Sequence, residues 1–478
     1  MALLQANPSE VGQLLPLLRQ EGFSGRLEGL GLVDPLGPKP WGGLFLPDPS
    51  IGRWAQWRQP AGPAAFSLVG QIHTLSTPAA LGHLQDLVTE PVQPWDALIC
   101  SSRAGRAVVE AVLADRERQI IDRSGGSAGS LQRRRPQLPV IPLPLPVAQM
   151  LAALPSQQEA RQALALPAHT HVVLWLGRLS ALTKADPYPL YAVLERVAQR
   201  LERPLVLIEC GPDDAAHQAE ECRQLRALCP ALTYVRLGGA QPVEEQVKLQ
   251  ALAAADLAVS LVDNTQETFG LAVAEAMAAG LPVVASDWDG YRDLVRDGID
   301  GFLVPSRWAA SAAALSVGLG WQQLTGLQSF PAMSGALAQL VHLDLAHAEA
   351  ACLNLLQDSA MAQAMGRAGQ QRALACFDAD QVMAHYEQLF GQLAELRAAA
   401  PAAAHQPQPS PLHLDPVRAF AGFASHPPLP QVKAGLPAMD QLPQPLRQAR
   451  MALWQLLLQA APAASRDELM LDLIRKHH

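Results

Sequence analysis

The chain has 478 residues, a net charge of −8, 49% apolar residues and 17% charged residues. This is the composition of a packed globular protein, and it excludes a largely disordered chain. The acidic balance excludes the broad basic face that nucleic-acid binding requires. The length exceeds what one core usually holds, so we expect two large domains.

The sequence carries no sign of export or of membrane insertion. No apolar run approaches the roughly 20 residues of a membrane-spanning helix, and the first residues lack the pattern of a signal peptide. The six cysteines are scattered without C-x-x-C or zinc spacing, which indicates a reducing compartment. We expect a cytoplasmic protein. The basic run 133–135 is interpreted as a solvated loop, with contact to an anionic membrane surface as the alternative.

The first part of the chain alternates strands and helices from residue 64 onward. An amphipathic helix is expected earlier, at 9–21. Buried strands are expected at 66–69 and 95–100, and helices at 77–89 and 103–118. A flexible loop at 124–130 follows, and then a strand with a proline-rich domain crossing at 138–146.

A second α/β series begins at residue 171. Its strands are continuous apolar runs, which indicates a parallel sheet covered on both faces. We expect strands at 171–176, 204–210, 233–237, 256–261 and 282–286. We expect helices at 188–200, 217–228, 243–255 and 271–279. In such sheets ligands bind beyond the carboxyl ends of the strands.

Helices are expected to dominate the remainder of the chain, at 337–357 and 361–397. An Ala/Pro-rich linker at 398–411 and a helical tail at 412–478 follow. The predicted organisation is therefore two Rossmann-like domains, 1–146 and 147–345, with helices at 346–397 that pack back on them.

Two glutamates eight residues apart flank the start of a helix in the second domain. Glu267 precedes the turn Phe269-Gly270, and Glu275 lies about two turns into a mostly apolar helix. A helix that opens at a glycine offers free N–H groups and a positive dipole end to a phosphate. Glu275 needs a polar partner there, and a ribose would serve. Taken alone, the pair is better explained as two ordinary acids, one at the helix start and one on a solvated face.

Two cations follow the strand 171–176. Gly177, Arg178 and Lys184 lie on the loop at the strand end where ligands bind. Two cations on one loop can hold a diphosphate between them. A solvated loop is the alternative, but both groups fall at strand ends of one domain, which favours a shared anionic ligand.

Three further positions are weaker candidates. His73 follows a strand of the first domain, and a structural role is the alternative for this residue. Asp287 and Asp289 form a D-x-D pattern that elsewhere holds Mg²⁺ or Mn²⁺. We interpret this pair as loop structure and expect no metal or other cofactor.

Three segments together resemble the signature of group 1 glycosyltransferases, the retaining GT-B enzymes of the family 4 type. They are 264–271, 275–287 and 301–305, and the loop 177–187 resembles the same family's donor-phosphate loop. The resemblance implies the GT-B fold, an α/β architecture of two Rossmann-like domains with parallel sheets. The family's usual opening strand with a glycine-rich loop is not found, so the first domain is expected to be short.

The resemblance also implies a role for each site residue. Arg178 and Lys184 would bind the donor diphosphate, with Gly177 beside them, and Glu275 would bind the ribose. Glu267 would contact hydroxyls of the transferred sugar, and His73 would lie near the anomeric centre; these two are the expected catalytic residues. Backbone groups of the loop would cap sugar and phosphate, at Thr268, Phe269, Gly270 and Leu271.

The expected function is that of a retaining hexosyltransferase that uses a nucleotide-diphosphate sugar. Its acceptor would be a glycan, a lipid-linked or a small molecule in glycan or cell-surface polysaccharide synthesis. The short first domain motivates an alternative, a catalytically impaired GT-B protein that acts as a sugar-nucleotide-binding or partner subunit. A sugar-nucleotide epimerase or a phosphorylase is a further alternative.

Overall fold

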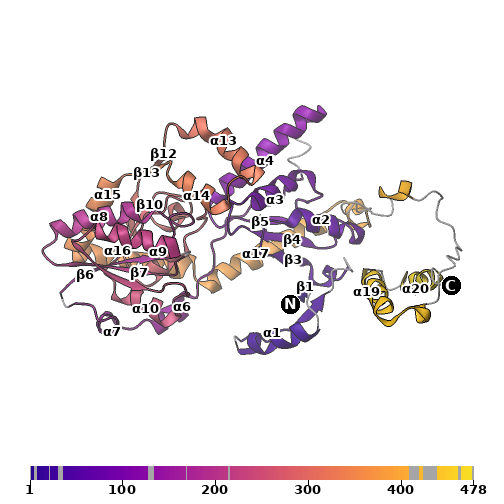
Figure 1. Cartoon of the computed structure of the whole chain (residues 1–478), viewed down its shortest axis with the longest axis horizontal. Coiled ribbons are helices and arrows are strands. Elements are labelled where there is room, and N and C mark those ends of the chain that lie inside the picture. The colour runs from indigo at the N-terminus through magenta and orange to yellow at the C-terminus, as the bar shows by residue number, and fades with distance from the viewer. Residues whose placement is uncertain are drawn as a thin grey trace. The chain divides into compact units, whose positions relative to one another are not determined.

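The computed structural model describes ten ranges of the chain (Figure 1). The chain divides into two compact units. The ranges are 2–4, 8–20, 22–30, 36–127, 134–167, 169–213, 216–408, 419–423, 439–460 and 465–475. The smaller unit comprises Met1–Leu44, Arg53–Leu68 and Ala394–His478, and the larger unit comprises Phe45–Gly52 and Val69–Leu393. The domain boundaries expected from sequence remain predictions.

The larger unit contains a six-stranded parallel sheet. The strand order is β11-β10-β9-β6-β7-β8, and each neighbouring pair is parallel. The strands are β6 (His171–Leu176), β7 (Leu205–Cys210), β8 (Leu232–Leu237), β9 (Leu257–Ser260), β10 (Val283–Ser286) and β11 (Gly301–Val304). The predicted α/β class with parallel sheets is therefore confirmed.

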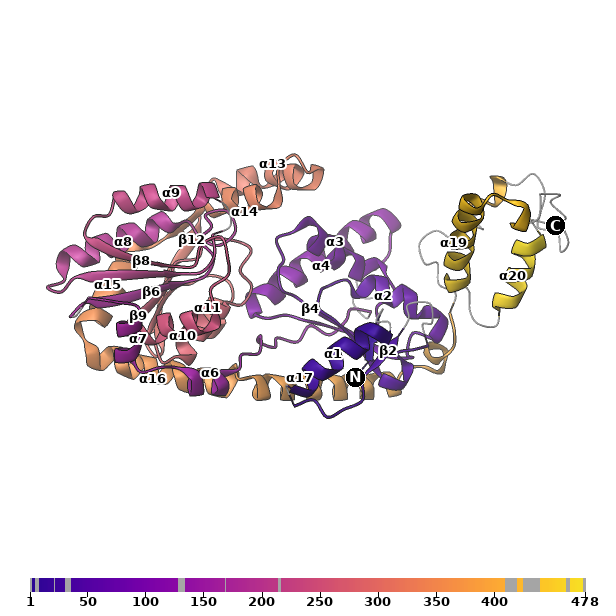
Figure 2. The ribbon, with the colours of Figure 1, turned by 60° about the horizontal axis from the view of Figure 1, so that its bottom comes forward.

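Helices cover both faces of this sheet, as the continuous apolar strands require (Figure 2). α8 packs on α15 at one face, and α11 packs on α16 and α6 at the other. The helices are α6 (Val147–Ala153), α7 (Gln157–Ala163), α8 (Pro187–Arg200), α9 (Ala216–Ala227), α10 (Glu245–Ala254), α11 (Leu271–Ala278), α12 (Tyr291–Leu294), α15 (Leu345–Gln357) and α16 (Ser359–Cys376).

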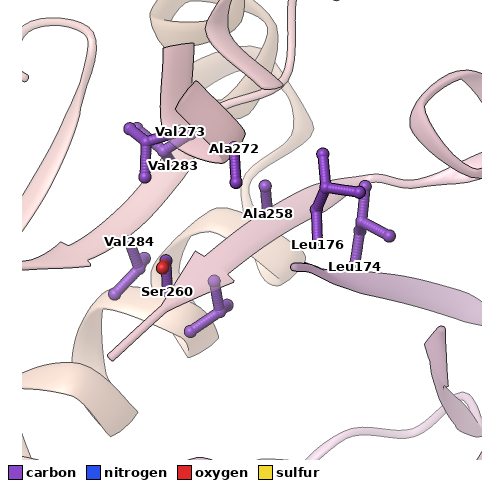
Figure 3. A pocket seen from close by; sticks show the side chains of 9 residues that line it. Leu174, Leu176, Ala258, Ser260, Ala272, Val273, Val283 and Val284 are labelled. Atoms are coloured by element: carbon purple, nitrogen blue, oxygen red, sulfur yellow. The ribbon is translucent and has the colours of Figure 1, made fainter. Parts of the chain in front are cut away.

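The core of the sheet is closely packed. Figure 3 shows apolar side chains of β6, β9, β10 and α11 around a small cavity, with Ser260 as the one polar side chain labelled. The cavity volume is about 10 Å³. A space of that size holds at most a water molecule. On β7 the carboxylate of the fully buried Glu209 forms an ion pair with Arg226 and accepts a hydrogen bond from the Tyr191 hydroxyl. These partners compensate its charge.

A second sheet lies nearer the N-terminus, with order β3-β4-β5. These strands are β3 (Gly43–Leu46), β4 (Ser67–Gln71) and β5 (Ala97–Ile99), with helices α2 (Ile51–Arg58), α3 (Pro78–Thr89) and α4 (Arg103–Ser124). In the larger unit, Val69, Ala97 and Ile99 pack against Val382 and Leu393 of α17 (Ala379–Ala398). The strand expected within 138–146 is wrong, because only isolated bridges form here, from Gln137 to Ala97 of β5 and from Val140 to Cys100 just after β5.

The smaller unit contains α1 (Pro8–Gln20), β1 (Ala2–Leu4), β2 (Glu28–Leu30), α19 (Gln444–Ala460) and α20 (Arg466–Arg475). Its one fully buried arginine, among the described residues, is Arg58, whose Nη1 donates to the carbonyl of Phe66 at 2.7 Å. Helices at 9–21 and in the tail were expected from sequence, and the described parts of both segments are helical. Residues 128–133, with part of the expected loop 124–130 and Arg133, lie outside the described ranges.

Two expected helices are wrong in part. The helix expected at 337–357 is divided, because β13 (Val341–Leu343) pairs with β12 (Ser306–Trp308) and α15 begins only after Asp344. The segment between these strands forms α13 (Ala312–Thr325) and α14 (Phe330–Ala338). The helix expected at 361–397 is two helices, since Phe377 and Ala379 exchange backbone hydrogen bonds with Leu145.

Candidate functional site

The loop after β6 positions the two predicted cations. Gly177 directly follows β6 with a φ of +138°, and a Cβ there would lie 3.2 Å from Cε of Lys184. The loop then closes on itself, because Ser180 Oγ accepts the N–H of Thr183 at 3.0 Å and the Ser180 carbonyl accepts the N–H of Lys184 at 3.0 Å. Glycine and these turn bonds together aim the Lys184 side chain back across the end of the sheet.

Lys184 and Glu267 form a buried ion pair at that edge. Nζ lies 2.5 Å from Oε2, and the two side chains are 16% and 14% exposed. Burial alone would lower the pKa of Lys184, but Tyr291 and Glu267 raise it above its usual value. Burial would likewise raise the pKa of Glu267, but Lys184 and the N–H groups of Thr268 and Phe269 lower it. Both groups are therefore charged at neutral pH, and each neutralises the other.

Arg178 lies on the same loop and is also anchored locally. Its Nη2 is 3.5 Å from the carbonyl of Thr183. When the Gln266 side-chain amide is oriented so that both its nitrogen and its oxygen have partners, the nitrogen donates to the Thr183 carbonyl. The oxygen then accepts from Arg178 Nη2 at 3.0 Å. The loop that carries Glu267 is thus bonded to the loop that carries both cations.

Glu275 has a partner that the sequence did not indicate. Lys248 on α10 places Nζ 2.8 Å from Oε1 of Glu275, which is 18% exposed, and it also pairs with the exposed Glu245 at 2.9 Å. The polar partner that Glu275 requires is therefore Lys248 in the structure. The binding of ribose by Glu275 stays a prediction. Lys248 could not be found by pattern, because α10 and α11 meet only in the folded sheet.

Gly270 and Tyr291 fix the start of α11. Gly270 has a φ of +107°, and a Cβ there would lie 2.3 Å from Cε1 of Tyr291. Only glycine fits this close approach. Tyr291 is fully buried, and its hydroxyl lies 2.8 Å from Ser260 Oγ and 3.5 Å from Glu267 Oε2. This tyrosine, a further residue missed by sequence reasoning, supports both the helix start and the Glu267 carboxylate.

His73 is brought to the same loop through its backbone. Its carbonyl accepts the hydroxyl of Thr268 at 2.9 Å, and Ser101 Oγ donates to the carbonyl of Thr268 at 3.1 Å. The His73 side chain is exposed. The structure thus places five predicted residues around one edge of the sheet, and their roles stay predictions: His73, Arg178, Lys184, Glu267 and Thr268.

The two aspartates of the D-x-D pattern have protein partners of different kinds. Asp287 pairs with Arg292 at 3.1 Å, whereas Asp289 accepts from Ser102 Oγ at 3.4 Å. Burial and the charge of Glu267 raise the pKa of Asp289 to about 7. Within the described ranges no cluster of three His, Cys, Asp or Glu residues could hold a metal ion. The absence of a metal requirement stays a prediction.

Asp263 supplies a pH-dependent prediction. Burial, and then the nearby Asp186, raise its pKa to about 7 from an unfolded value near 4. Between these two pKa values the folded state binds more protons than the unfolded state. The Asp263 carboxyl therefore lowers the free energy of unfolding as the pH rises from about 4 to about 7, and this loss persists above pH 7. Asp263→Asn should therefore gain about 1–4 kcal/mol of unfolding free energy over the parent between pH 5 and pH 8.

Thermal unfolding of both proteins at the two pH values checks this expectation. Asp115→Asn, at a side chain that is 68% exposed, is the control and should show no such gain. An Asp263→Asn effect of equal size at pH 5 and pH 8 would contradict the assignment.

A parallel sheet with cations, buried carboxylates and a helix start at one edge defines a Rossmann-like domain suited to an anionic ligand. Residues 170–318 match the family model for glycosyl transferases group 1. The match confirms, over this part of the chain, the family that the sequence motifs resemble.

Curated relatives agree with this assignment. The chain is 35% identical over 162 residues to a D-inositol 3-phosphate glycosyltransferase of Thermobispora bispora. The aligned segment covers 33% of this chain and 37% of that protein. A protein of the same name from Geodermatophilus obscurus is 30% identical over 256 residues, 51% of this chain and 52% of its own. The chain thus spans about a third to a half of the length of these relatives.

Two solved structures are among those similar to the chain. Sucrose-phosphate synthase from Thermosynechococcus elongatus has a TM-score of 0.49 at 20% identity, with 83% of each chain covered. HepE of Anabaena in complex with UDP has a TM-score of 0.49 at 18% identity, with 81% of this chain and 90% of that chain covered. Among the helices that the structure describes, none is long and apolar enough to cross a membrane.

Proposed function

We propose that the protein is a retaining glycosyltransferase that takes its sugar from a nucleotide-diphosphate sugar. The observation that carries the proposal is the buried Lys184–Glu267 pair, which sits with Arg178 at one edge of the sheet. The family match over 170–318 supports the same reading.

The chemistry follows from charge. When the bond from the sugar to the diphosphate breaks, positive charge develops on the sugar and negative charge on the leaving group. Arg178 and Lys184 are cations at the edge where the leaving diphosphate would lie, and they would stabilise it as charge builds. Glu267 would hold sugar hydroxyls, and Glu275 with Lys248 would hold the ribose. This assignment needs no metal and no cofactor.

The proposed acceptor class is a glycan, a lipid-linked sugar or a small molecule, in glycan or polysaccharide synthesis. The curated relatives are named for D-inositol 3-phosphate, so that compound belongs in any acceptor panel. All six cysteines are free, five of them buried, which supports a reducing compartment such as the cytoplasm.

One assay tests both the reaction and its independence of metal. UDP-, GDP- and ADP-sugars are incubated with the protein, and release of the nucleoside diphosphate is measured with and without a chelator. We expect turnover of at least one donor, and a chelator should leave that rate within about twofold, because protein cations replace the metal. Loss of activity with the chelator would contradict this expectation and make Asp287 and Asp289 the candidates for metal ligands.

A second candidate is a sugar-nucleotide-binding subunit without transferase activity. It is favoured by the small sheet β3-β4-β5, which has three strands among the described residues. Binding of a nucleotide sugar without any release of nucleoside diphosphate, in the presence of the acceptor panel, would establish this alternative.

A further inference from the structure

A cavity of about 610 Å³ opens beside the loop that carries Glu267. This volume is in the range of small-molecule sites. One wall comes from α3, α4 and the segment before them, and the other comes from residues 265–308 with Leu337. Thr265 lines the cavity two residues before Glu267, and the Glu267 charge acts directly on Asp289, another lining residue. The cavity is therefore a neighbour of the proposed donor sugar.

Two tryptophans form one wall of this cavity. The rings of Trp288 and Trp308 lie 5.3 Å apart between centroids at an angle of 62°. Trp288 is held by a hydrogen bond from Nε1 to the carbonyl of Asn264 at 2.9 Å. Trp308 on β12 is 46% exposed. The exposed Trp308 ring packs against the fixed Trp288 ring and offers a flat apolar face. The negative electrostatic potential over that face attracts the C–H groups on one side of a pyranose.

Polar groups of the same cavity are suited to hydroxyls. The Thr265 hydroxyl oxygen is buried and has no hydrogen-bond partner within the described part of the chain. Leaving such a group unsatisfied is costly, so a ligand hydroxyl would stabilise it. Asp289 adds an acceptor. An apolar wall opposite hydroxyl-binding groups is the pattern that a carbohydrate requires.

We propose that this cavity is the acceptor site and that the acceptor is a carbohydrate. Its ring packs on Trp308, and its hydroxyls bond to Thr265 and Asp289. The assignment rests on the proposed function, since the acceptor must lie beside the transferred sugar. The acceptor oxygen then bonds to the anomeric carbon while the sugar–phosphate bond breaks. The electron pair leaves with the nucleoside diphosphate, and the hydroxyl proton passes to an oxygen of that diphosphate.

The test titrates simple glycosides into the full chain. Methyl glycosides of glucose, mannose, galactose and N-acetylglucosamine are the probes, and ligand-observed NMR gives the affinity. At least one should bind the parent, Trp308→Ala should weaken its binding about tenfold, and Trp308→Phe should retain most of it. Trp321→Ala is the matched control, because Trp321 is 61% exposed on α13 and does not line the cavity.

Two results would overturn the proposal. One is that no glycoside binds the parent, and the other is that Trp308→Ala binds as the parent does. Nucleotide binding to the parent is measured in parallel, so that the two proposals can fail separately. If glycosides bind at Trp308 and no nucleoside diphosphate binds, the acceptor role falls with the proposed function. If nucleotides bind and glycosides do not, the donor site stands and this inference alone is wrong.

Discussion

Glu267→Gln is expected to lower donor turnover about 100-fold or more. The change removes a charge that contacts Lys184 at 2.5 Å and that we assign to the hydroxyls of the transferred sugar. Loss of one preorganised polar contact in a water-poor site has an effect of this size on the chemical step. The measurement is kcat and KM for the best nucleotide sugar of the panel.

A double variant separates this catalytic effect from a folding defect. Glu267→Gln alone leaves the Lys184 cation buried without its carboxylate, and should lower the free energy of unfolding by about 3 kcal/mol. Lys184→Met combined with Glu267→Gln removes both charges and should recover much of that stability while activity stays low. Recovery of activity in the double variant would contradict a direct role for the pair.

The second large effect is expected at Glu275. Glu275→Gln should weaken donor binding at least tenfold, because a carboxylate that binds ribose hydroxyls becomes a neutral amide. Glu245→Gln is the matched control, since Glu245 pairs with the same Lys248 but is 69% exposed on α10. Equal effects of the two changes would show that Glu275 acts only on Lys248, and the ribose assignment would be wrong.

Much of the larger unit could be predicted from local pattern. The strand expected at 171–176 is β6 with the same limits, because a continuous apolar run between turn residues has few alternatives in a doubly covered sheet. The helix expected at 77–89 is α3, whose start is fixed by Thr77, which accepts the N–H of Ala80. The α/β class of the fold follows from the alternation of such apolar strands with helices.

The errors arise where distant pairing decides local structure. Residues 341–343 continue a helical pattern, yet they pair with β12, and Asp344 then begins α15 as its N-cap. The break between α16 and α17 is likewise set by Leu145, far away in sequence. Local helix and strand propensities cannot predict contacts between residues that are distant in sequence.

The candidate site shows the same division. Arg178 and Lys184 at a strand end and Glu267 before a helix start were predicted together with the family resemblance, and the structure brings them together. Lys248 and Tyr291 were not predicted, because each acts on the site from an element whose position only the fold determines.

Calorimetric titration with nucleoside diphosphates tests the central claim, that this edge of the sheet holds the donor. UDP, GDP and ADP are added to the parent and to Arg178→Ala in the presence of a chelator. We predict that at least one nucleotide binds the parent and that Arg178→Ala weakens its affinity at least tenfold, about 1.4 kcal/mol. Failure of all three to bind the parent, or equal affinity for both proteins, would contradict the account.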